Sequence, residues 1–253
     1  MATYEKALKK LGKSVGVFES KERGRITLKK CLVPPDSLAI EQLRKLRSTL
    51  VYHNSVRVLH TLLVTSCLPG EGKTTVAANL SAVLAQGVDS PVILIDADLR
   101  RRSLTAILGL QGRAGLADFL VGNAPVQDLL GKTEIDNLSI LSAGSHRANP
   151  AELIASARMR DLLEQLKEEY EGSYVIIDST PLVATSEPNV LSEFVDGVLL
   201  VVRAEQTRRD IVRRELKELD SEKMIGVVLN GAEFESSQYY RKPYEAYLPG
   251  RGL

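Results

Sequence analysis

The stretch SCLPGEGKTT contains the residues of this sequence that are best suited to chemistry. It fits the phosphate-binding pattern G-x-x-x-x-G-K-[ST], except that Cys67 stands where the first glycine is expected. Gly70 and Gly72 allow the backbone to curl so that successive N–H groups face an anion. Lys73 is then expected to reach the β- and γ-phosphates of a nucleotide, and the Thr74 hydroxyl is expected to bind Mg²⁺.

The segments on either side decide whether this stretch is a phosphate loop. HTLLVTS precedes it and predicts a strand, and KTTVAANLSAVLAQ follows and predicts a helix that Gly87 ends. A strand, a glycine-rich loop and a helix form the context that the motif requires, whereas the alternative is a turn that carries a lysine by chance. Cys67 lies at the loop entrance, where a side chain restricts φ without removing a donor to the anion. We therefore expect a working loop.

Three aspartates follow apolar segments. Asp96 and Asp98, in VILIDADLRRR, are two residues apart and are expected on one face at the carboxyl end of a strand. One of them can join a metal shell while the other accepts a proton from an attacking hydroxyl. Asp178, in YVIIDSTP, is expected to orient Mg²⁺; the alternative for each aspartate is a helix cap or a turn. We expect Lys73, Asp96 and Asp98 to be catalytic, and Thr74, Asp96 and Asp178 to hold the metal.

The elements that must position these residues alternate along the chain. Short, nearly continuous apolar segments predict strands at 60–66, 91–98, 138–144, 174–178, 197–202 and 224–230. Strands of this kind are buried on both faces. Helical periodicity is present at 74–86, 150–170 and 208–219. The fold class is therefore α/β, an NTPase-like domain with a mainly parallel sheet flanked by helices on both faces and an active site at the carboxyl ends of the strands.

The 253 residues divide into three segments by composition. Residues 1–35 form a basic N-terminal arm, because the first thirty carry nine Lys or Arg and three Glu. This arm is either a solvated tail or a dock for anionic lipid or an acidic partner. Residues 36–232 are expected to be the catalytic domain, which starts with a helix after Pro34 and Pro35. Residues 233–253 form a C-terminal tail.

Composition excludes several classes of protein. The 33 basic and 32 acidic residues nearly cancel, so bulk charge gives no support for nucleic-acid binding. The two cysteines lack metal-type spacing and cannot form a disulfide framework, which favours a reducing, cytoplasmic setting. No apolar run approaches the ~20 residues of a membrane-spanning helix, and the N-terminus lacks the apolar stretch of a secretion signal. We expect a cytoplasmic protein that can lie beside a membrane.

The motifs SCLPGEGKTT, LIDADLR and IIDSTP, spaced as they are here, resemble those of the bacterial tyrosine autokinases of polysaccharide synthesis and export. Those kinases have a P-loop fold, and a small residue often replaces the first glycine of their loop. The resemblance implies that ATP and Mg²⁺ are the cofactors and that phosphoryl groups are transferred to tyrosine. The ATP-binding residues that it implies are Pro69, Gly70, Glu71, Gly72, Lys73, Thr74, Thr75 and, at the rim for the base, Arg203 and Asn230.

The segment EQLRKLR adds a second feature of that family. Glu41, Arg44 and Arg47 match the E-x-x-R-x-x-R helix through which neighbouring subunits join into a ring. The resemblance therefore implies a ring-like homo-oligomer. By spacing alone, the same charges could be an ordinary exposed pair on a helix.

The C-terminal segment SSQYYRKPYEAYLPGRGL contains half of the eight tyrosines of the chain. With glycine, proline and few aliphatic residues, it is an unlikely part of a core. The family carries its phosphate-accepting tyrosines at this place, so the resemblance implies that the acceptors are Tyr239, Tyr240, Tyr244 and Tyr247. The alternative is aromatic packing of a tail that lies on the domain.

The chain departs from the family pattern in three respects, of which the first is that its tyrosine cluster is sparse. The D-T-P-P often found in the family is here Asp178, Ser179, Thr180 and Pro181, which keeps the acid and one proline. The membrane-spanning activator that some relatives carry in the same chain is missing. We therefore expect a separate partner, a membrane-embedded polysaccharide co-polymerase that activates the kinase and holds it at the inner face of the plasma membrane.

Two other functions compete with tyrosine autophosphorylation. A positioning or partition ATPase switch has a related loop, but such proteins usually carry a lysine early in the loop, where this chain has Leu68. An ATP-binding scaffold without transfer activity also fits the sequence, because binding and transfer use overlapping groups. Phosphate incorporation distinguishes these functions from the kinase.

Overall fold

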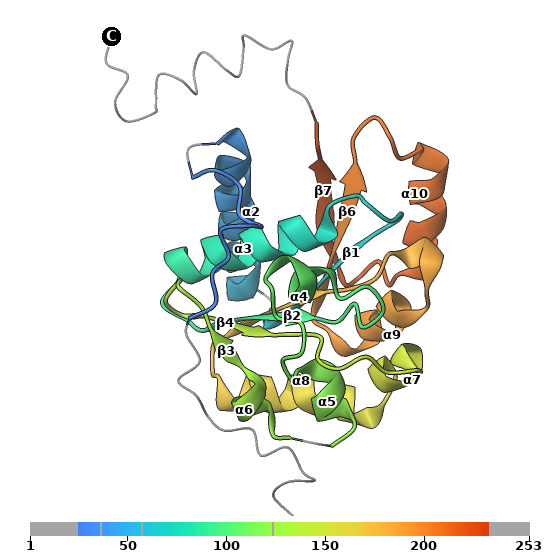
Figure 1. Cartoon of the computed structure of the whole chain (residues 1–253). Coiled ribbons are helices and arrows are strands. Elements are labelled where there is room, and N and C mark those ends of the chain that lie inside the picture. The colour runs from blue at the N-terminus through green and yellow to red at the C-terminus, as the bar shows by residue number, and fades with distance from the viewer. Residues whose placement is uncertain (1–24, 36, 57, 123, 233–253) are drawn as a thin grey trace, which may run out of the picture.

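The computed structural model describes residues 25–35, 37–56, 58–122 and 124–232. Within them the chain forms a seven-stranded sheet with helices on both faces, as the sequence predicts (Figure 1). The four C-terminal tyrosines lie outside the described residues. Within the described part, no helix combines the length and apolar character needed to span a bilayer.

The sheet places β1 at its centre. Its strands are β1 (Thr61–Ser66), β2 (Val92–Asp96), β3 (Gly131–Lys132), β4 (Leu138–Leu141), β5 (Tyr174–Asp178), β6 (Gly197–Arg203) and β7 (Met224–Asn230). Their order is β3-β4-β2-β5-β1-β6-β7, and every neighbouring pair is parallel except β3 and β4. All six predicted strands are confirmed. β3 was not predicted, because two residues are too few to show a period.

The helices follow the predictions less closely. They are α2 (Leu38–Val56), α3 (Lys73–Gly87), α4 (Ser103–Ile107), α5 (Leu116–Leu120), α6 (Val126–Leu129), α7 (Pro150–Ile154), α8 (Ala157–Glu169), α9 (Glu187–Phe194) and α10 (Arg209–Glu215), with 3-10 turns η1 (Leu182–Ala184) and η2 (Leu216–Glu218). The single helix predicted at 150–170 is two helices. Ser156 has an extended backbone and its hydroxyl donates to the Leu153 carbonyl (2.7 Å), which separates α7 from α8.

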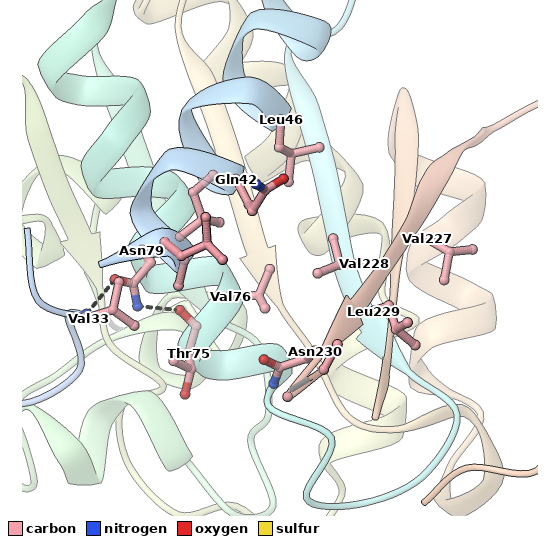
Figure 2. A pocket seen from close by; sticks show the side chains of 15 residues that line it. Val33, Gln42, Leu46, Thr75, Val76, Asn79, Val227, Val228, Leu229 and Asn230 are labelled. Atoms are coloured by element: carbon pink, nitrogen blue, oxygen red, sulfur yellow. Dashed lines mark hydrogen bonds between the residues drawn. The ribbon is translucent and has the colours of Figure 1, made fainter. Parts of the chain in front are cut away.

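One face of the sheet is covered by α3, and α2 packs on α3 (Figure 1). Between α2, α3 and the edge strand β7 lies an apolar groove of about 440 Å³ (Figure 2). The side chains that line it include Gln42 and Leu46 of α2, Thr75 and Val76 of α3, and Val228 and Asn230 of β7. The groove meets the start of α3 at Thr75.

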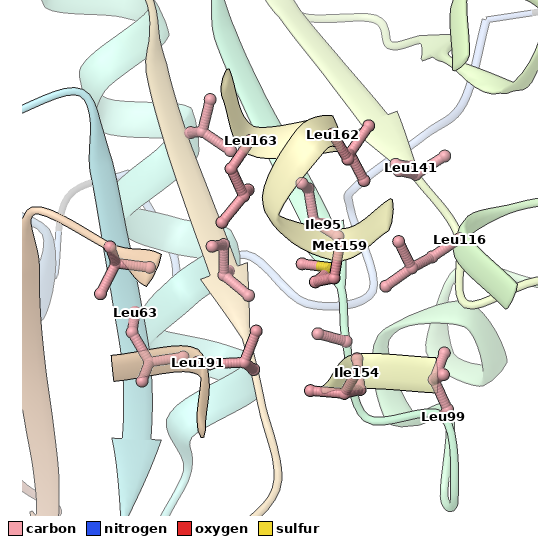
Figure 3. Packing of buried hydrophobic residues seen from close by; sticks show 14 of the residues in the cluster. Leu63, Ile95, Leu99, Leu116, Leu141, Ile154, Met159, Leu162, Leu163 and Leu191 are labelled. Carbon is pink, nitrogen blue, oxygen red and sulfur yellow. The ribbon is translucent and has the colours of Figure 1, made fainter. Parts of the chain in front are cut away.

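The opposite face carries the second half of the core. Leu63 and Ile95 of the central strands pack there with Met159 and Leu163 of α8 and with Leu191 of α9 (Figure 3). All six residues of β1 are buried, which explains why Leu62, Leu63 and Val64 follow one another without polar alternation. Each fully buried leucine contributes roughly 1.5 to 3 kcal/mol, so the sheet that carries the site is a rigid support.

The boundary of the N-terminal arm differs from the expected position. Although residues 1–35 were predicted as one arm, Ile26 forms a β-bridge with Thr133, and Leu28 is fully buried. The Val33 N–H donates to Asn79 Oδ1 (2.8 Å), and Asn79 Nδ2 donates to the Cys31 carbonyl (2.8 Å). The residues from 26 to 33 thus belong to the domain. The prediction failed here because the segment is mostly basic, and its few apolar residues form no recognisable pattern.

Candidate active site

The loop between β1 and α3 has the curl that an anion site requires. Gly70 and Gly72 have φ of 85° and 92°, which glycine adopts without strain. Gly72 is the N-cap of α3 and provides no side-chain cap, so the first N–H groups of this fifteen-residue helix remain available to an anion. The loop therefore presents backbone donors where the sequence predicts them.

Gly72 is also required by a close neighbour. A Cβ at this position would lie 2.1 Å from Nδ2 of Asn230, at the end of β7. That amide nitrogen donates to the Glu71 carbonyl (2.8 Å). Asn230 thus lies against the phosphate loop and lines the groove, and its role at the rim for the base stays a prediction.

The side chain of Cys67 packs in the core and does not take part in the anion site. Its side chain is fully buried in the core cluster that includes Leu63. Desolvation by burial, with smaller contributions from Glu71 and Glu215, raises the pKa of its thiol to about 12. The residue that replaces the expected glycine is therefore a neutral apolar contact beneath the loop.

Lys73 and Asp98 face each other at the start of α3. Their Nζ and Oδ2 atoms are 3.8 Å apart, and their side chains are 12% and 1% exposed. Asp98 Oδ1 accepts a hydrogen bond from the Arg101 backbone N–H (2.8 Å), which fixes the turn after β2. The predicted pair of catalytic groups is thus brought together in a nearly dry environment.

Asp96 is held by one oxygen and leaves the other unused. Its Oδ2 accepts two hydrogen bonds from Thr105, from the backbone N–H (2.8 Å) and from the hydroxyl (2.7 Å). The Thr105 hydroxyl oxygen in turn accepts from the Ala143 N–H (2.9 Å) after β4. Asp96 Oδ1 is buried and makes no hydrogen bond among the described residues. Thr105, which no sequence motif singles out, orients this carboxylate.

Asp178 lies beside Asp96 because β5 and β2 pair in register at these two residues. Both of its carboxylate oxygens are buried without a hydrogen-bond partner in the described part of the chain. Burial raises the pKa of Asp178; Lys73 opposes this shift and Asp96 adds to it. Burial likewise raises the pKa of Asp96, and the bonds from Thr105 oppose that shift. Both acids therefore hold protons unusually tightly until a cation arrives.

The carboxylate oxygens of Asp96 and Asp178 that lack hydrogen bonds are candidate ligands for Mg²⁺. Among the described residues, no group of three His, Cys, Asp or Glu side chains could hold a metal ion by itself. Mg²⁺, however, is usually bound by one or two carboxylates together with substrate phosphates and water. Asp96 and Asp178 with unused oxygens, and Thr74 at the start of α3, match that donor set. The predicted metal residues fit the ion.

Two of the predicted ATP-binding residues have other contacts. The Glu71 side chain is committed to protein donors, among them the Arg203 N–H (3.0 Å), so only its backbone faces the anion site. Arg203, at the end of β6, packs its guanidinium over Gly231, where a Cβ would lie 2.5 Å from Arg203 Cζ. Pro69 and Thr75 are exposed at the loop and at the start of α3.

The α2 residues predicted to join subunits are divided between two roles. Glu41 and Arg44 form an ion pair on the outer surface of the helix. Arg47 instead donates to the Val83 carbonyl of α3 (3.2 Å) and lies over Gly87. A cation at the end of α3 is favourable for the helix dipole. Arg47 therefore has a place within one chain, and the ring contact stays a prediction for all three residues.

Comparison with known proteins places these features in a family. A family model described as an AAA domain matches residues 63–219. Tyrosine-protein kinase YwqD of Bacillus subtilis is 30% identical over 83% of this chain and 88% of its own length. Tyrosine-protein kinase ptk of Acinetobacter johnsonii is 32% identical over 81% of this chain but only 28% of its own length. The kinase domain of the Escherichia coli tyrosine kinase ETK superposes with a TM-score of 0.73 at 31% identity and covers 80% of this chain and 79% of that domain.

Proposed function

Because this chain belongs to the family of bacterial P-loop tyrosine-protein kinases, we propose that it is an ATP-dependent protein tyrosine autokinase. The observation that carries the proposal is the arrangement around Lys73. Three fully buried aspartates with unused oxygens meet one ammonium group at the N-terminus of α3. A magnesium triphosphate complements this combination of donors and acceptors.

Each residue has one task in the proposed reaction. The loop N–H groups and Lys73 bind the β- and γ-phosphates and neutralise charge that develops during transfer. Thr74, Asp96 and Asp178 would hold Mg²⁺, which would supply positive charge to offset that of the phosphates. Asp98 accepts the proton of the tyrosine hydroxyl. Its contact with Lys73 keeps its carboxylate beside the phosphate site.

The apolar groove offers a place for the nucleotide base. It is lined by Thr75, which directly follows the proposed metal ligand Thr74, and by Asn230, whose amide can form hydrogen bonds. Pockets for small ligands are usually apolar with a few polar groups that fix orientation, and this groove has that character. We place the base there, with Asn230 and Arg203 at the rim.

The substrate in this proposal is the tyrosine-bearing tail. Tyr239, Tyr240, Tyr244 and Tyr247 lie outside the described residues and stay a prediction as acceptors. Each phosphate adds about −1.5 to −2 charges, so four would add roughly −6 to −8 to a chain of net charge +1. Such a change would loosen a ring that forms through Glu41, Arg44 and Arg47. The proposed role is regulation of exopolysaccharide synthesis or export beside a membrane-embedded co-polymerase, at the inner face of the plasma membrane.

The decisive experiment is a measurement of intact mass after incubation with Mg-ATP. The kinase predicts additions in units of one phosphate, which Lys73→Ala abolishes and which a variant with phenylalanine at the four tail tyrosines strongly reduces. Release of free phosphate without a gain in mass would support a positioning ATPase instead. ATP binding with neither product would support a scaffold.

One observation disfavours the ATPase switch. Leu68 stands where such switches usually carry a lysine, and its side chain packs against the core. Its backbone N–H donates to Glu71 (2.5 Å). The position therefore supports the loop from below and offers no second cation to the phosphates.

A further inference from the structure

The phosphate loop contains a buried carboxylate with no partner of opposite charge. Glu71 is 2% exposed and forms no ion pair within the described ranges. It accepts hydrogen bonds from the Leu68 N–H (2.5 Å), from the Arg203 N–H (3.0 Å) and from the Thr207 hydroxyl. A buried charge is unfavourable unless several donors surround it, and a negative charge this close to an anion site also repels phosphate. A structural gain must offset both effects.

The hydrogen bonds of Glu71 belong to a closed circuit. From its carboxylate the circuit passes to the backbone of Arg203, then from the Ala204 N–H to the Asn230 carbonyl (2.9 Å). The Asn230 side chain returns to the Glu71 carbonyl (2.8 Å). The phosphate loop is thereby held to the carboxyl ends of both β6 and β7. Both the side chain and the main-chain carbonyl of Glu71 take part in these contacts.

We propose that Glu71 and Thr207 form a clasp that keeps the phosphate loop in its anion-binding curl before a nucleotide binds. Gly70 and Gly72 make the curl possible but also leave the free loop many other conformations. A loop that is already ordered loses less entropy when it captures phosphate, and so binds more tightly. Glu71 is thus a positioning residue for the phosphates, and the inference rests on the proposed function only for the identity of the nucleotide.

A carboxylate suits the clasp better than an amide does. It has two acceptor oxygens and no donor, so three donors can share it. Its hydrogen bonds to N–H groups are charge-assisted and roughly twice as strong as neutral ones. A glutamine of the same shape must turn its NH₂ toward Leu68 N–H or toward Arg203 N–H, neither of which can rotate away. Glu71→Gln therefore breaks the clasp with little change in volume.

The test measures nucleotide-free loop order and ADP binding together. For Glu71→Gln we expect faster deuterium exchange in peptides that cover residues 67–73 without nucleotide. We also expect a Kd for Mg-ADP, by calorimetry, about ten- to a hundredfold above that of the parent protein. In kinetics the loss should appear in KM for ATP and not in kcat. Glu134→Gln is the matched control, because Glu134 also accepts a backbone N–H, from Leu28 (3.1 Å), but next to β3.

Thr207 provides an independent variant in case Glu71→Gln fails to fold. Thr207→Val keeps the volume and removes the hydroxyl donor, so we expect a Kd about three- to tenfold above the parent value. Thr207→Ser should restore binding, and adding Thr207→Val to Glu71→Gln should have little further effect, because both break one clasp. Parent-like exchange and affinity in Glu71→Gln and Thr207→Val would overturn the inference, as would a loss confined to kcat.

The readouts also separate this inference from the proposed function. Exchange and ADP affinity require no phosphoryl transfer. If the parent protein gained no phosphate but the variants behaved as expected, the kinase proposal would fail and the clasp would stand. If the tail were phosphorylated while both variants bound ADP like the parent, the clasp would fail and the kinase would stand.

Discussion

The two halves of the crevice differ in how fully their polar groups are satisfied. On the β6 and β7 side, Glu71 and Asn230 have protein partners, and the phosphate loop is tied in place. On the β2 and β5 side, Asp96, Asp98 and Asp178 each leave at least one buried oxygen without a hydrogen bond in the described part of the chain. The polar groups of the first half are paired within the protein, whereas the second half leaves carboxylate oxygens that a bound cation could use. A binding site can thus combine a phosphate loop that is held in place by protein hydrogen bonds with carboxylates that have unpaired oxygens.

The largest expected effect on activity comes from removing the negative charges on the β2 side of the crevice. Asp96→Asn and Asp98→Asn should each reduce autophosphorylation by roughly a hundred- to a thousandfold, because catalysis in this class depends on positioned charge. Phosphate incorporation over time measures the effect. Asp136→Asn, an exposed carboxylate that pairs with Arg25, is the control and should leave the rate unchanged. Unchanged rates in both crevice variants would remove these acids from the mechanism.

A smaller effect on activity is expected from removing the hydrogen bond that the Thr105 hydroxyl donates to Asp96. Thr105→Val removes the hydroxyl that bonds to Asp96 Oδ2 and should reduce kcat/KM about tenfold and raise the Mg²⁺ concentration for half-maximal rate. Thr105→Ser keeps the hydroxyl and should retain most of the activity. If valine and serine gave the same rate, the hydroxyl would not orient Asp96.

The raised pKa values of Asp96 and Asp178 predict how metal binding depends on pH. Because Mg²⁺ must displace protons that the folded protein holds tightly, affinity for Mg-ADP should increase between about pH 5.5 and pH 7.5, by up to about tenfold per unit for each proton released. Calorimetry at several pH values in buffers of different ionisation enthalpy measures both the affinity and the protons. ADP without Mg²⁺ is the control and should show a weaker dependence.

The smallest effect concerns stability without ligand. A carboxyl whose pKa is raised on folding binds its proton more tightly in the folded protein. Its own contribution to stability is therefore greatest below the unfolded pKa and is lost as pH rises through the folded pKa. Asp178→Asn removes that penalty. In EDTA at pH 8 it should increase the free energy of unfolding by about 1 kcal/mol, measured in urea, even though it abolishes metal-dependent activity. A destabilised variant would show that Asp178 has a structural partner.

The sequence predicted the parts of this molecule that are encoded locally. The phosphate loop and the acids that end β2 and β5 are each read from fewer than a dozen neighbouring residues, and the strands from short apolar runs. Thr105 and Thr207 could not be selected in this way. Thr207 meets Glu71 from 136 positions away, and Thr105 matters because the Ala143 N–H, just after β4, donates to its hydroxyl oxygen. Nothing in the composition around either threonine differs from an ordinary helix start.

The same distinction explains the helices and the N-terminal boundary. The break at Ser156 depends on one hydroxyl that turns back to a carbonyl, and helical periodicity continues across it. Ile26 and Leu28 are only two apolar residues in a basic segment. They are buried because Ile26 pairs with Thr133 and because both pack in the core on the α2 and α3 face of the sheet. Patterns that extend over a whole element were predicted well, and contacts between distant elements were not.

The burial of Cys67 has a consequence for the chemistry of oxidation. Because burial raises the pKa of its thiol to about 12, very little of the reactive thiolate is present at pH 7. Peroxide and alkylating reagents attack the thiolate, so the cysteine at the entrance of the phosphate loop is shielded from both. The chain thus carries sulfur within a few residues of Lys73 in a form that resists oxidation.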